Sequence, residues 1–195
     1  PKNPGRLLDA GSALNHDFLL DRAPLSGAQL TVMTLAPEKR CFWNRGISYL
    51  YGDLREPHFP DACFDVVVSV STIEHIGLDN TMLYTGDHTK QETDDLGYVP
   101  AIEQFRRVLK PGGVCLVTVP FGRRGTHGWY QVFDEPGIAK VIETFAPATH
   151  SVDYFGHGEV GWYRSSPSAL ADAEFHDVHQ HKRPATDRAA GARAV

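Results

Sequence analysis

The sequence lacks the features that mark several large classes of protein. Its three cysteines are far apart and form no C-x-x-C pair, which excludes a disulfide framework and a cysteine-based zinc site. No apolar run approaches the roughly 18 residues of a membrane span, and no internal repeat is present. The formal net charge of -5 does not favour binding to nucleic acid. We therefore expect a cytoplasmic protein with reduced thiols and with neither a membrane nor a nucleic-acid partner.

The sequence does have the composition of an ordinary globular domain. Its 195 residues are 42% hydrophobic and 22% charged, which suffices to bury a core without covalent cross-links. We expect a single domain over residues 1–195. Because strand-like segments stand close to both ends of the sequence, we expect this domain to be truncated at both ends. The sequence carries no signal of the oligomeric state.

Apolar runs alternate with segments of helical spacing. The clearest strand covers residues 64–70, where Val66, Val67 and Val68 form a continuous apolar run, as in strands buried on both faces. The clearest helix covers residues 99–109, and the sequence Lys-Pro-Gly-Gly at 110–113 should end it. Further strands are predicted at 6–10, 30–35, 47–51, 114–119, 151–155 and 192–195, and further helices at 15–22, 134–145 and 165–173. This order predicts an α/β fold with a doubly wound, mainly parallel sheet, in which ligands bind beyond the carboxyl ends of the strands.

Small residues follow the first predicted strand. Asp9 stands at its end, and Gly11, Ser12 and Ala13 come next. A ligand could therefore approach the backbone amides closely at the start of a helix. The full G-x-G-x-x-G pattern of a dinucleotide site is absent, since only Gly11 remains. By itself this segment fits a plain tight turn as well as a cofactor site.

Polar residues also follow the next three predicted strands. Thr34 stands where a dinucleotide site carries the acidic residue that binds ribose, and Glu38 lies about one turn further on. Asp53, followed by Leu54, could accept a hydrogen bond from an exocyclic amine, although Asp is also common in β-turns. The fourth strand leads into residues 71–75. All these residues should meet at one edge of the sheet.

Four segments, taken in order, resemble the class I S-adenosylmethionine-dependent methyltransferases, especially the group that modifies sugars, natural products and other small molecules. They are LLDAGS at 7–12, GDL at 52–54, the stretch 64–75 that ends in Glu-His, and RVLKPGG at 107–113. The resemblance covers residues 6–121, and the last of the four segments is its most specific part.

The resemblance implies a Rossmann-like, seven-stranded sheet whose last strand is antiparallel. It implies S-adenosyl-L-methionine as the cofactor, with S-adenosyl-L-homocysteine as its product, and methyl transfer by in-line displacement to a small-molecule acceptor. It also assigns cofactor-binding residues around the predicted crevice. Asp9, Gly11, Ser12 and Ala13 would hold the methionine end, Thr34 the ribose, Asp53 and Leu54 the adenine, and Ser71, Thr72 and Ile73 the region of the sulfonium.

His75 is the candidate catalytic residue. A hydroxyl acceptor must lose a proton, and an imidazole titrates near neutral pH, so His75 could act as the general base. Glu74 could orient His75 or contact the cofactor. The alternative is structural, with His75 packing beside Glu74 at the start of a helix.

Three loops are predicted around the acceptor: a polar, acidic lid at about 77–97, and acceptor-side loops at about 122–133 and 156–166. The last two loops carry cationic and aromatic side chains that suit a sugar, a carboxylate or a phosphate. These side chains are Arg123, Arg124, His127, Trp129, Tyr130, Trp162, Tyr163 and Arg164. Ordinary solvated loops are the alternative.

No metal site is predicted. The lid carries side chains that suit Mg²⁺ or Mn²⁺, namely Asp79, Asp87, His88, Glu92, Asp94 and Asp95. Because acidic loops are usually just solvated, a divalent metal is the less favoured alternative. His176, His179 and His181 lack the further ligands that would complete a zinc site.

Two other functions fit parts of the pattern. Thr34 and the single glycine favour a non-catalytic Rossmann-like binding module, or a degenerate methyltransferase homologue that acts through a partner. An NAD-dependent oxidoreductase shares the predicted fold, but the poor glycine pattern and the Lys-Pro-Gly-Gly segment argue against it. Binding of S-adenosylhomocysteine would separate the enzyme from the binding module.

Overall fold

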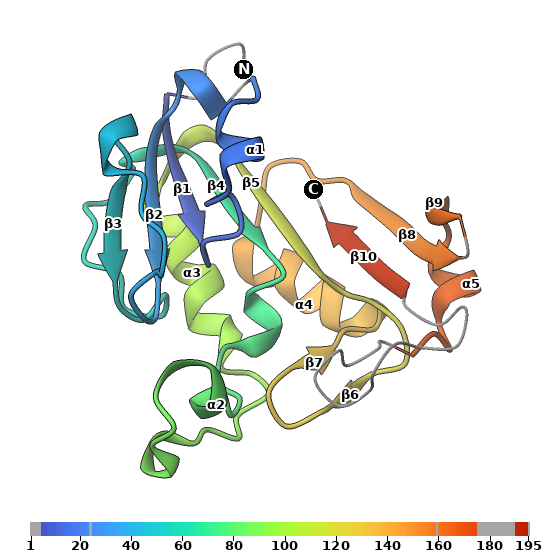
Figure 1. Cartoon of the computed structure of the whole chain (residues 1–195). Helices are drawn as coiled ribbons and strands as arrows, with labels where there is room; N and C mark the ends of the chain where they lie inside the picture. Colours follow the sequence, from blue (N-terminus) through green and yellow to red (C-terminus); the bar gives the residue numbers. More distant parts are fainter. Residues whose placement is uncertain (1–4, 24, 159, 175–189, 195) are drawn as a thin grey trace.

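The computed structural model describes residues 5–23, 25–158, 160–174 and 190–194. One eight-stranded sheet runs through the molecule in the order β3-β2-β1-β4-β5-β10-β8-β9 (Figure 1). Its strands are β1 (Arg6–Ala10), β2 (Gln29–Thr34), β3 (Ser48–Tyr51), β4 (Phe64–Val70), β5 (Leu109–Pro120), β8 (Val152–Gly158), β9 (Gly161–Ser165) and β10 (Ala190–Ala194). The first five strands of the sheet are parallel to one another. The prediction of a doubly wound, mainly parallel sheet is confirmed.

The far side of the sheet holds the antiparallel strands. β10 pairs antiparallel with both β5 and β8, as predicted for the last strand of the chain. β9 adds an eighth strand at the edge by pairing antiparallel with β8. Residues 156–166, predicted as a loop, therefore lie largely in a β-hairpin, because backbone pairing extends from Tyr154–Ser165 to Gly158–Gly161.

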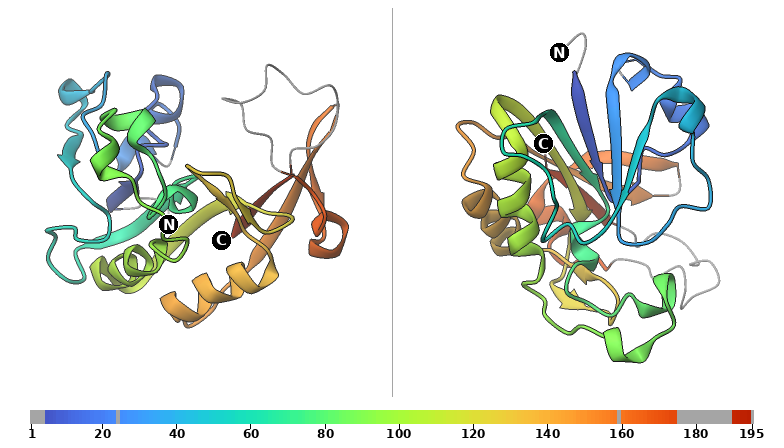
Figure 2. Two further views of the ribbon diagram at one scale, coloured as in Figure 1. Left: turned by 90° about the horizontal axis from the view of Figure 1, so that it is seen from below. Right: turned by 90° about the vertical axis from the view of Figure 1, so that its left-hand side faces the viewer.

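The central strands are buried on both faces, as their continuous apolar runs predict. In β4, Val67 belongs to one core cluster, whereas Val66 and Val68 belong to the other, which is the alternation expected of a strand. The first cluster lies under α3 (Tyr98–Val108) and α4 (Glu135–Phe145), which lie side by side on one face (Figure 2). The second lies under the segments 17–27 and 42–47.

The helices vary in how well they match the predicted boundaries. α4 begins where predicted, because the Asp134 carboxylate accepts a hydrogen bond from the Gly137 amide and caps the helix. The helix predicted at 15–22 is only the single turn α1 (Asp17–Leu20), and that predicted at 165–173 is α5 (Pro167–Leu170). The remaining short elements are η1 (Leu25–Gly27), η2 (Trp43–Arg45), η3 (Ile73–His75), α2 (Thr81–Tyr84), η4 (His88–Lys90), β6 (Gly125–Thr126) and β7 (Gln131–Val132).

The Lys-Pro-Gly-Gly segment is not a linker between α3 and its following strand. β5 begins at Leu109, directly after the helix, and pairs there with Phe64. The pairing register then shifts, so that Val66 faces Val114 and the four intervening residues bulge from the ladder. A side chain at Gly113 would press on the Leu109 side chain and the Asp65 carbonyl, so this bulge needs glycine.

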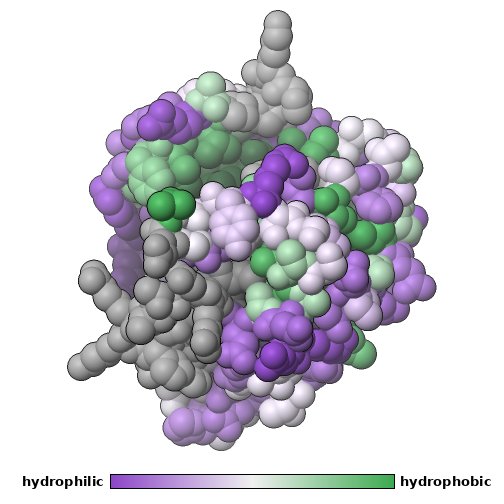
Figure 3. Space-filling view, turned by 90° about the vertical axis from the view of Figure 1, so that its right-hand side faces the viewer, coloured by the Kyte–Doolittle hydropathy of each residue, from purple (hydrophilic) through white to green (hydrophobic). Residues whose placement is uncertain are grey.

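The edge that carries β8 and β9 exposes aromatic side chains. Trp162 and Tyr163 are largely exposed there, and the same face shows hydrophobic areas bordered by hydrophilic ones (Figure 3). None of the helices in the described ranges has the length and apolar character needed to cross a membrane.

Candidate cofactor and acceptor site

A cavity of about 610 Å³ lies beyond the carboxyl ends of the parallel strands. Its lining joins residues that follow β1, β2, β3 and β4 with the inner side of the loop 77–97. In Figure 1 this loop, with α2, lies below the ends of these strands. Among the residues predicted to bind cofactor, Gly11, Thr34, Asp53, Leu54, Ser71 and Thr72 line the cavity.

Gly11 closely approaches the Thr72 side chain, just after the end of β4. Its φ is +116°, which residues with side chains rarely adopt. A Cβ at this position would overlap the side chain of Thr72, which lines the same cavity. The next residue, Ser12, is also left-handed, with φ +70°. The turn is thus shaped so that its backbone borders the cavity and the end of β4 at once.

Asp9 lies behind this turn and is fully buried. Its Oδ2 accepts a hydrogen bond of 2.8 Å from the Leu14 amide, whereas Oδ1 is buried without a hydrogen-bond partner among the described residues. Burial raises the pKa of Asp9 to about 7, against the opposing effect of hydrogen bonds from the Leu14 and Ala13 amides. Asp9 does not line the cavity, and neither do Ser12 and Ala13; Asp9 holds the shape of the turn from behind.

Burial of the Asp9 carboxylate makes the stability of the domain depend on pH. The pKa of Asp9 is about 7 in the folded protein, whereas the ordinary value is 3.8. Between pH 3.8 and pH 7 the folded chain therefore binds more protons than the unfolded chain, and the free energy of unfolding falls as pH rises. We predict that Asp9→Asn removes this loss. Compared with the wild type, the variant should be similar in stability near pH 4 and more stable at pH 8, by up to about 4 kcal/mol. Denaturant unfolding across this range tests the prediction, and a difference that does not change with pH would contradict it.

A second side of the cavity is lined by the end of β2 and by residues that follow β3. Thr34 is buried, and its hydroxyl bonds with the phenol of Tyr84, whose pKa is raised by burial and lowered less strongly by this bond. Leu54 is buried beside Asp53. The carboxylate of Asp53 is about one-third exposed. A cofactor nucleoside could thus meet a hydroxyl, an apolar side chain and a carboxylate here.

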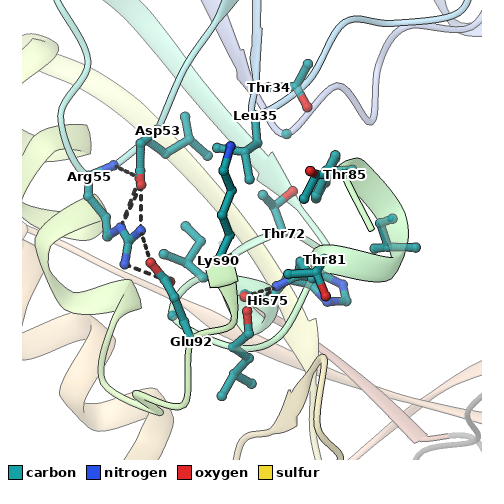
Figure 4. A pocket seen from close by; sticks show the side chains of 18 of the residues that line it. Thr34, Leu35, Asp53, Arg55, Thr72, His75, Thr81, Thr85, Lys90 and Glu92 are labelled. Carbon is teal, nitrogen blue, oxygen red and sulfur yellow. Dashed lines mark hydrogen bonds and ion pairs between the residues drawn. The ribbon is translucent and has the colours of Figure 1, made fainter. Parts of the chain in front are cut away.

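Arg55 occupies much of the hydrogen-bonding capacity of Asp53. Its guanidinium donates to both Asp53 oxygens at 2.6 to 3.0 Å, and also to both Glu92 oxygens at 2.7 and 3.0 Å. Partial burial would raise the pKa of Asp53, but the bonds and charge of Arg55 hold it below its ordinary value. Figure 4 shows Arg55 between the two carboxylates at one side of the cavity. Arg55 therefore ties the end of β3 to the loop 77–97.

The loop 77–97 closes on itself at its base. Gly77 and Gly97 pack so tightly that a Cβ on Gly97 would lie 2.6 Å from the Gly77 Cα, and the Asp94 amide donates to the Gly77 carbonyl at 2.8 Å. From this base the loop extends over the cavity, where Leu78, Thr81 and Lys90 line it. The Lys90 side chain points into the cavity in Figure 4.

Residues 71–75 turn sharply after β4. Ser71 has φ +49°, its amide donates to the Thr118 side chain at 3.1 Å, and its hydroxyl donates to Glu74 Oε1 at 2.5 Å. Ser71 and Thr72 line the cavity, but Ile73 is fully buried in the core beside it. Ile73 thus supports the turn from within, away from the predicted contact with cofactor.

His75 lines the cavity and has a defined tautomer. Its Nδ1 lies 2.9 Å from the Trp129 carbonyl, and because a carbonyl only accepts, Nδ1 must carry the proton. The ring stacks on the Trp129 ring with a centroid distance of 4.8 Å. Burial lowers the pKa of His75, against the opposing effect of the bond to Trp129. At neutral pH the imidazole is therefore neutral, and Nε2 carries a lone pair.

None of the cationic and aromatic residues predicted in the two acceptor-side loops lines the cavity. Arg123 forms ion pairs with Asp172 and Glu174, and Arg124 with Asp95 and Asp134. His127 stacks on Tyr130, and Trp129 packs against His75. Trp162, Tyr163 and Arg164 lie on the edge strand β9. Trp129 and Tyr130 thus pack beside His75, and the residues of β9 lie at the far edge of the sheet.

The acidic residues of the lid hold the loop together. Asp79 accepts from the Thr81 hydroxyl and from Gln91, Asp87 accepts from the Thr89 amide, and Asp94 accepts from the Leu96 amide. In the described part of the chain no three His, Cys, Asp or Glu side chains lie together as metal ligands would. His176, His179 and His181, considered for zinc, lie outside the described residues.

Sequence reasoning missed most of the lid side of the cavity. The residues concerned are Leu35, Arg55, Leu78, Asn80, Thr81, Tyr84, Lys90 and Gln91. Arg55 could have been noticed from its place two residues after Asp53, which suits a local ion pair. Its bond to Glu92 joins residues far apart in the sequence and leaves no pattern there.

Comparison with known proteins identifies a matching family and several solved structures with a similar fold. The family model described as "Methyltransferase domain" matches residues 9–117, and no curated protein sequence matches the chain. Among solved structures, phosphoethanolamine N-methyltransferase 2 of Haemonchus contortus, solved with phosphomonomethylethanolamine and S-adenosylhomocysteine, is 20% identical with a TM-score of 0.55, over 79% of this chain and 36% of that one.

Two further structures have similar folds. The 1,6-didemethyltoxoflavin-N1-methyltransferase of Burkholderia thailandensis is 14% identical with a TM-score of 0.56, over 98% of this chain and 70% of that one. The [4+2]-cyclase SpnF is 20% identical with a TM-score of 0.50, over 77% of this chain and 53% of that one. The chain thus spans about half or less of several proteins that it matches. At these identities the likeness establishes the fold alone.

Proposed function

The chain belongs to the methyltransferase-domain family, and on this premise we propose that it transfers a methyl group from S-adenosylmethionine to a small-molecule acceptor. The observation that carries the proposal is the convergence of Gly11, Thr34, Asp53, Leu54, Ser71 and Thr72 on one cavity. These residues lie at or just after the carboxyl ends of four different strands, and the resemblance in sequence assigns each of them to the cofactor. Two of the similar solved structures are methyltransferases with S-adenosylhomocysteine bound, which supports the same assignment.

The residues present fit this cofactor. The turn at Gly11 leaves no room for a side chain beside Thr72, so its backbone borders the cavity directly, and the buried Asp9 behind it keeps one oxygen without a hydrogen-bond partner among the described residues. Asp53 keeps part of its carboxylate exposed for an exocyclic amine, while Leu54 offers an apolar surface for a base. Thr34 would hydrogen-bond the ribose with a neutral hydroxyl, which is weaker than a carboxylate.

The protein would contribute alignment, exclusion of water and removal of a proton. When bound, S-adenosylmethionine supplies an activated methyl group. The loop 77–97, tied down by Arg55 and Glu92, would cover the reacting groups. His75, neutral and with Nε2 free to accept, would take the proton from a hydroxyl acceptor.

Binding of the cofactor product tests the proposal. S-adenosylhomocysteine should raise the melting temperature of the protein in a concentration-dependent manner, and NAD should not. Asp53→Ala should weaken the affinity for S-adenosylhomocysteine roughly tenfold, the loss of about one hydrogen bond to a charged group. Asp153→Ala is the matched control, because Asp153 also pairs with an arginine and is similarly exposed, at 32% against 33%. Equal affinities of wild type and Asp53→Ala would show that the end of β3 does not bind the nucleoside.

A further inference from the structure

Glu74 is a fully buried carboxylate that the proposed function leaves without a role. It is 1% exposed, and its Oε2 has no hydrogen-bond partner among the described residues. Oε1 accepts the hydroxyl of Ser71 at 2.5 Å. A buried carboxylate with one unsatisfied oxygen costs stability, and no structural need for it is visible, since the surrounding turn is held by other bonds.

The position of Glu74 connects it to His75. Oε1 lies 4.0 Å from His75 Nε2, the nitrogen that is free to accept a proton. This distance is too long for a direct hydrogen bond but short enough for an electrostatic interaction once His75 is protonated. Ser71 and His75 both line the cavity, and Glu74 lies behind them. Ser71, Glu74 and His75 thus form one cluster, in which the Glu74 carboxylate is the group buried away from solvent.

Resting on the proposed function, we propose that Glu74 is a positioning residue that stabilises the protonated form of His75 during transfer to a hydroxyl acceptor. The acceptor O–H bond breaks, its proton passes to His75 Nε2, and its electron pair remains on the acceptor oxygen, which forms the new bond to the methyl carbon. The bond between that carbon and the sulfonium sulfur breaks at the same time, and its electron pair stays on the sulfur of the leaving thioether. His75 becomes an imidazolium whose positive charge faces the Glu74 carboxylate. The proton leaves to solvent after turnover, which returns His75 to its neutral form.

Few other charges act on this cluster. Burial raises the pKa of Glu74 to about 7, opposed by the bond from Ser71, and burial lowers the pKa of His75, opposed by its bond to Trp129. The elements packed against η3 are α3, β5 and β7. The charged side chains of α3 and β5 are exposed or paired elsewhere; they are Glu103, Arg106, Arg107 and Lys110. The other titratable side chains on or beside these elements are the phenols of Tyr98 and of Tyr130, just before β7, and the thiol of Cys115. Burial raises the pKa of Tyr98 and raises that of Cys115 to about 12, so both are neutral at pH 7.

The test is the titration of His75 by NMR in Glu74→Gln. The glutamine side chain of this variant would keep an acceptor for the Ser71 hydroxyl but cannot carry charge. Because Glu74, with a pKa of about 7, is only partly ionised while His75 titrates, the pKa of His75 should fall by a few tenths of a unit or more. Glu103→Gln, a change of the same type on the exposed face of α3, should leave the pKa of His75 unchanged. A pKa of His75 that is the same in Glu74→Gln and in the wild type would overturn the proposal.

Two further measurements keep the test decisive. If Glu74→Gln does not fold, the titration of His75 in the wild-type protein tests the proposal by itself. The resonances of His75 should then titrate in two steps, because Glu74 ionises beside it. A single step would overturn the proposal. Binding of S-adenosylhomocysteine is measured on the same samples. Its absence would contradict the proposed function, whereas an unchanged pKa of His75 contradicts only the role of Glu74.

Discussion

Gly11→Ala is expected to lower the affinity for S-adenosylhomocysteine by on the order of 10²-fold or more. The added methyl group would overlap the Thr72 side chain, and the backbone at φ +116° is strained for any residue with a side chain. Strain and overpacking each cost about 1 to 3 kcal/mol. Relief requires the turn and Thr72 to move, and both border the cavity. The affinity should be measured by titration calorimetry.

Gly46→Ala separates the effect on the cavity from the effect on backbone strain. Gly46 also has a positive φ, of +70°, but a Cβ there would meet no atom within 4 Å. This variant should lose stability and keep its affinity for S-adenosylhomocysteine. Because Gly11→Ala is also destabilised, its fold is checked by circular dichroism at the temperature of the titration. A folded Gly11→Ala variant with the affinity of the wild type would show that the first turn does not hold the cofactor.

The second large effect is expected from His75→Ala. Removing a general base typically costs on the order of 10²-fold or more in turnover, and His75 is the imidazole that lines the cavity with its Nε2 free to accept. The affinity for S-adenosylhomocysteine should change little. Release of S-adenosylhomocysteine can be followed with any hydroxyl acceptor that the wild-type protein methylates, so the assay needs no dedicated detection of the methylated product.

Two comparisons make this prediction specific to the role of a base. His157→Ala changes an exposed histidine on β8, outside the cavity, and should leave turnover unchanged. Added imidazole should restore part of the activity of His75→Ala, because it can enter the space that the side chain vacates. Full activity in His75→Ala would remove this residue from the reaction and leave it as a packing partner of Trp129.

The parallel half of the fold could be predicted from the sequence because its strands are buried on both faces. Continuous apolar runs then stand out, and residues 6–10 and 64–70 are strands as predicted. The capped helix α4 was equally clear, since its cap is a local interaction. The edge strand β9 was missed because it is mostly exposed, so no apolar pattern marks it. The bulge at 110–113 was missed because proline and glycine predict a break but not its form.

The candidate site could be predicted only where residues follow strands. The carboxyl ends of parallel strands meet at one edge, which places Gly11, Thr34 and Asp53 together without knowledge of the structure. The side of the cavity formed by the loop 77–97 could not be predicted, because that loop has neither periodicity nor a local motif. Its acidic residues were considered as metal ligands, whereas Glu92 pairs with Arg55. Such long-range pairing depends on the path of the loop through space.

The central claim is that the cavity beyond β1 to β4 binds the methyl-donor cofactor. Isothermal titration calorimetry of the wild-type protein with S-adenosylhomocysteine tests it most directly. The account predicts a saturable heat of binding with one site per chain, which Gly11→Ala abolishes or greatly weakens. A folded wild-type protein that gives no heat of binding and no thermal shift at millimolar S-adenosylhomocysteine would contradict it.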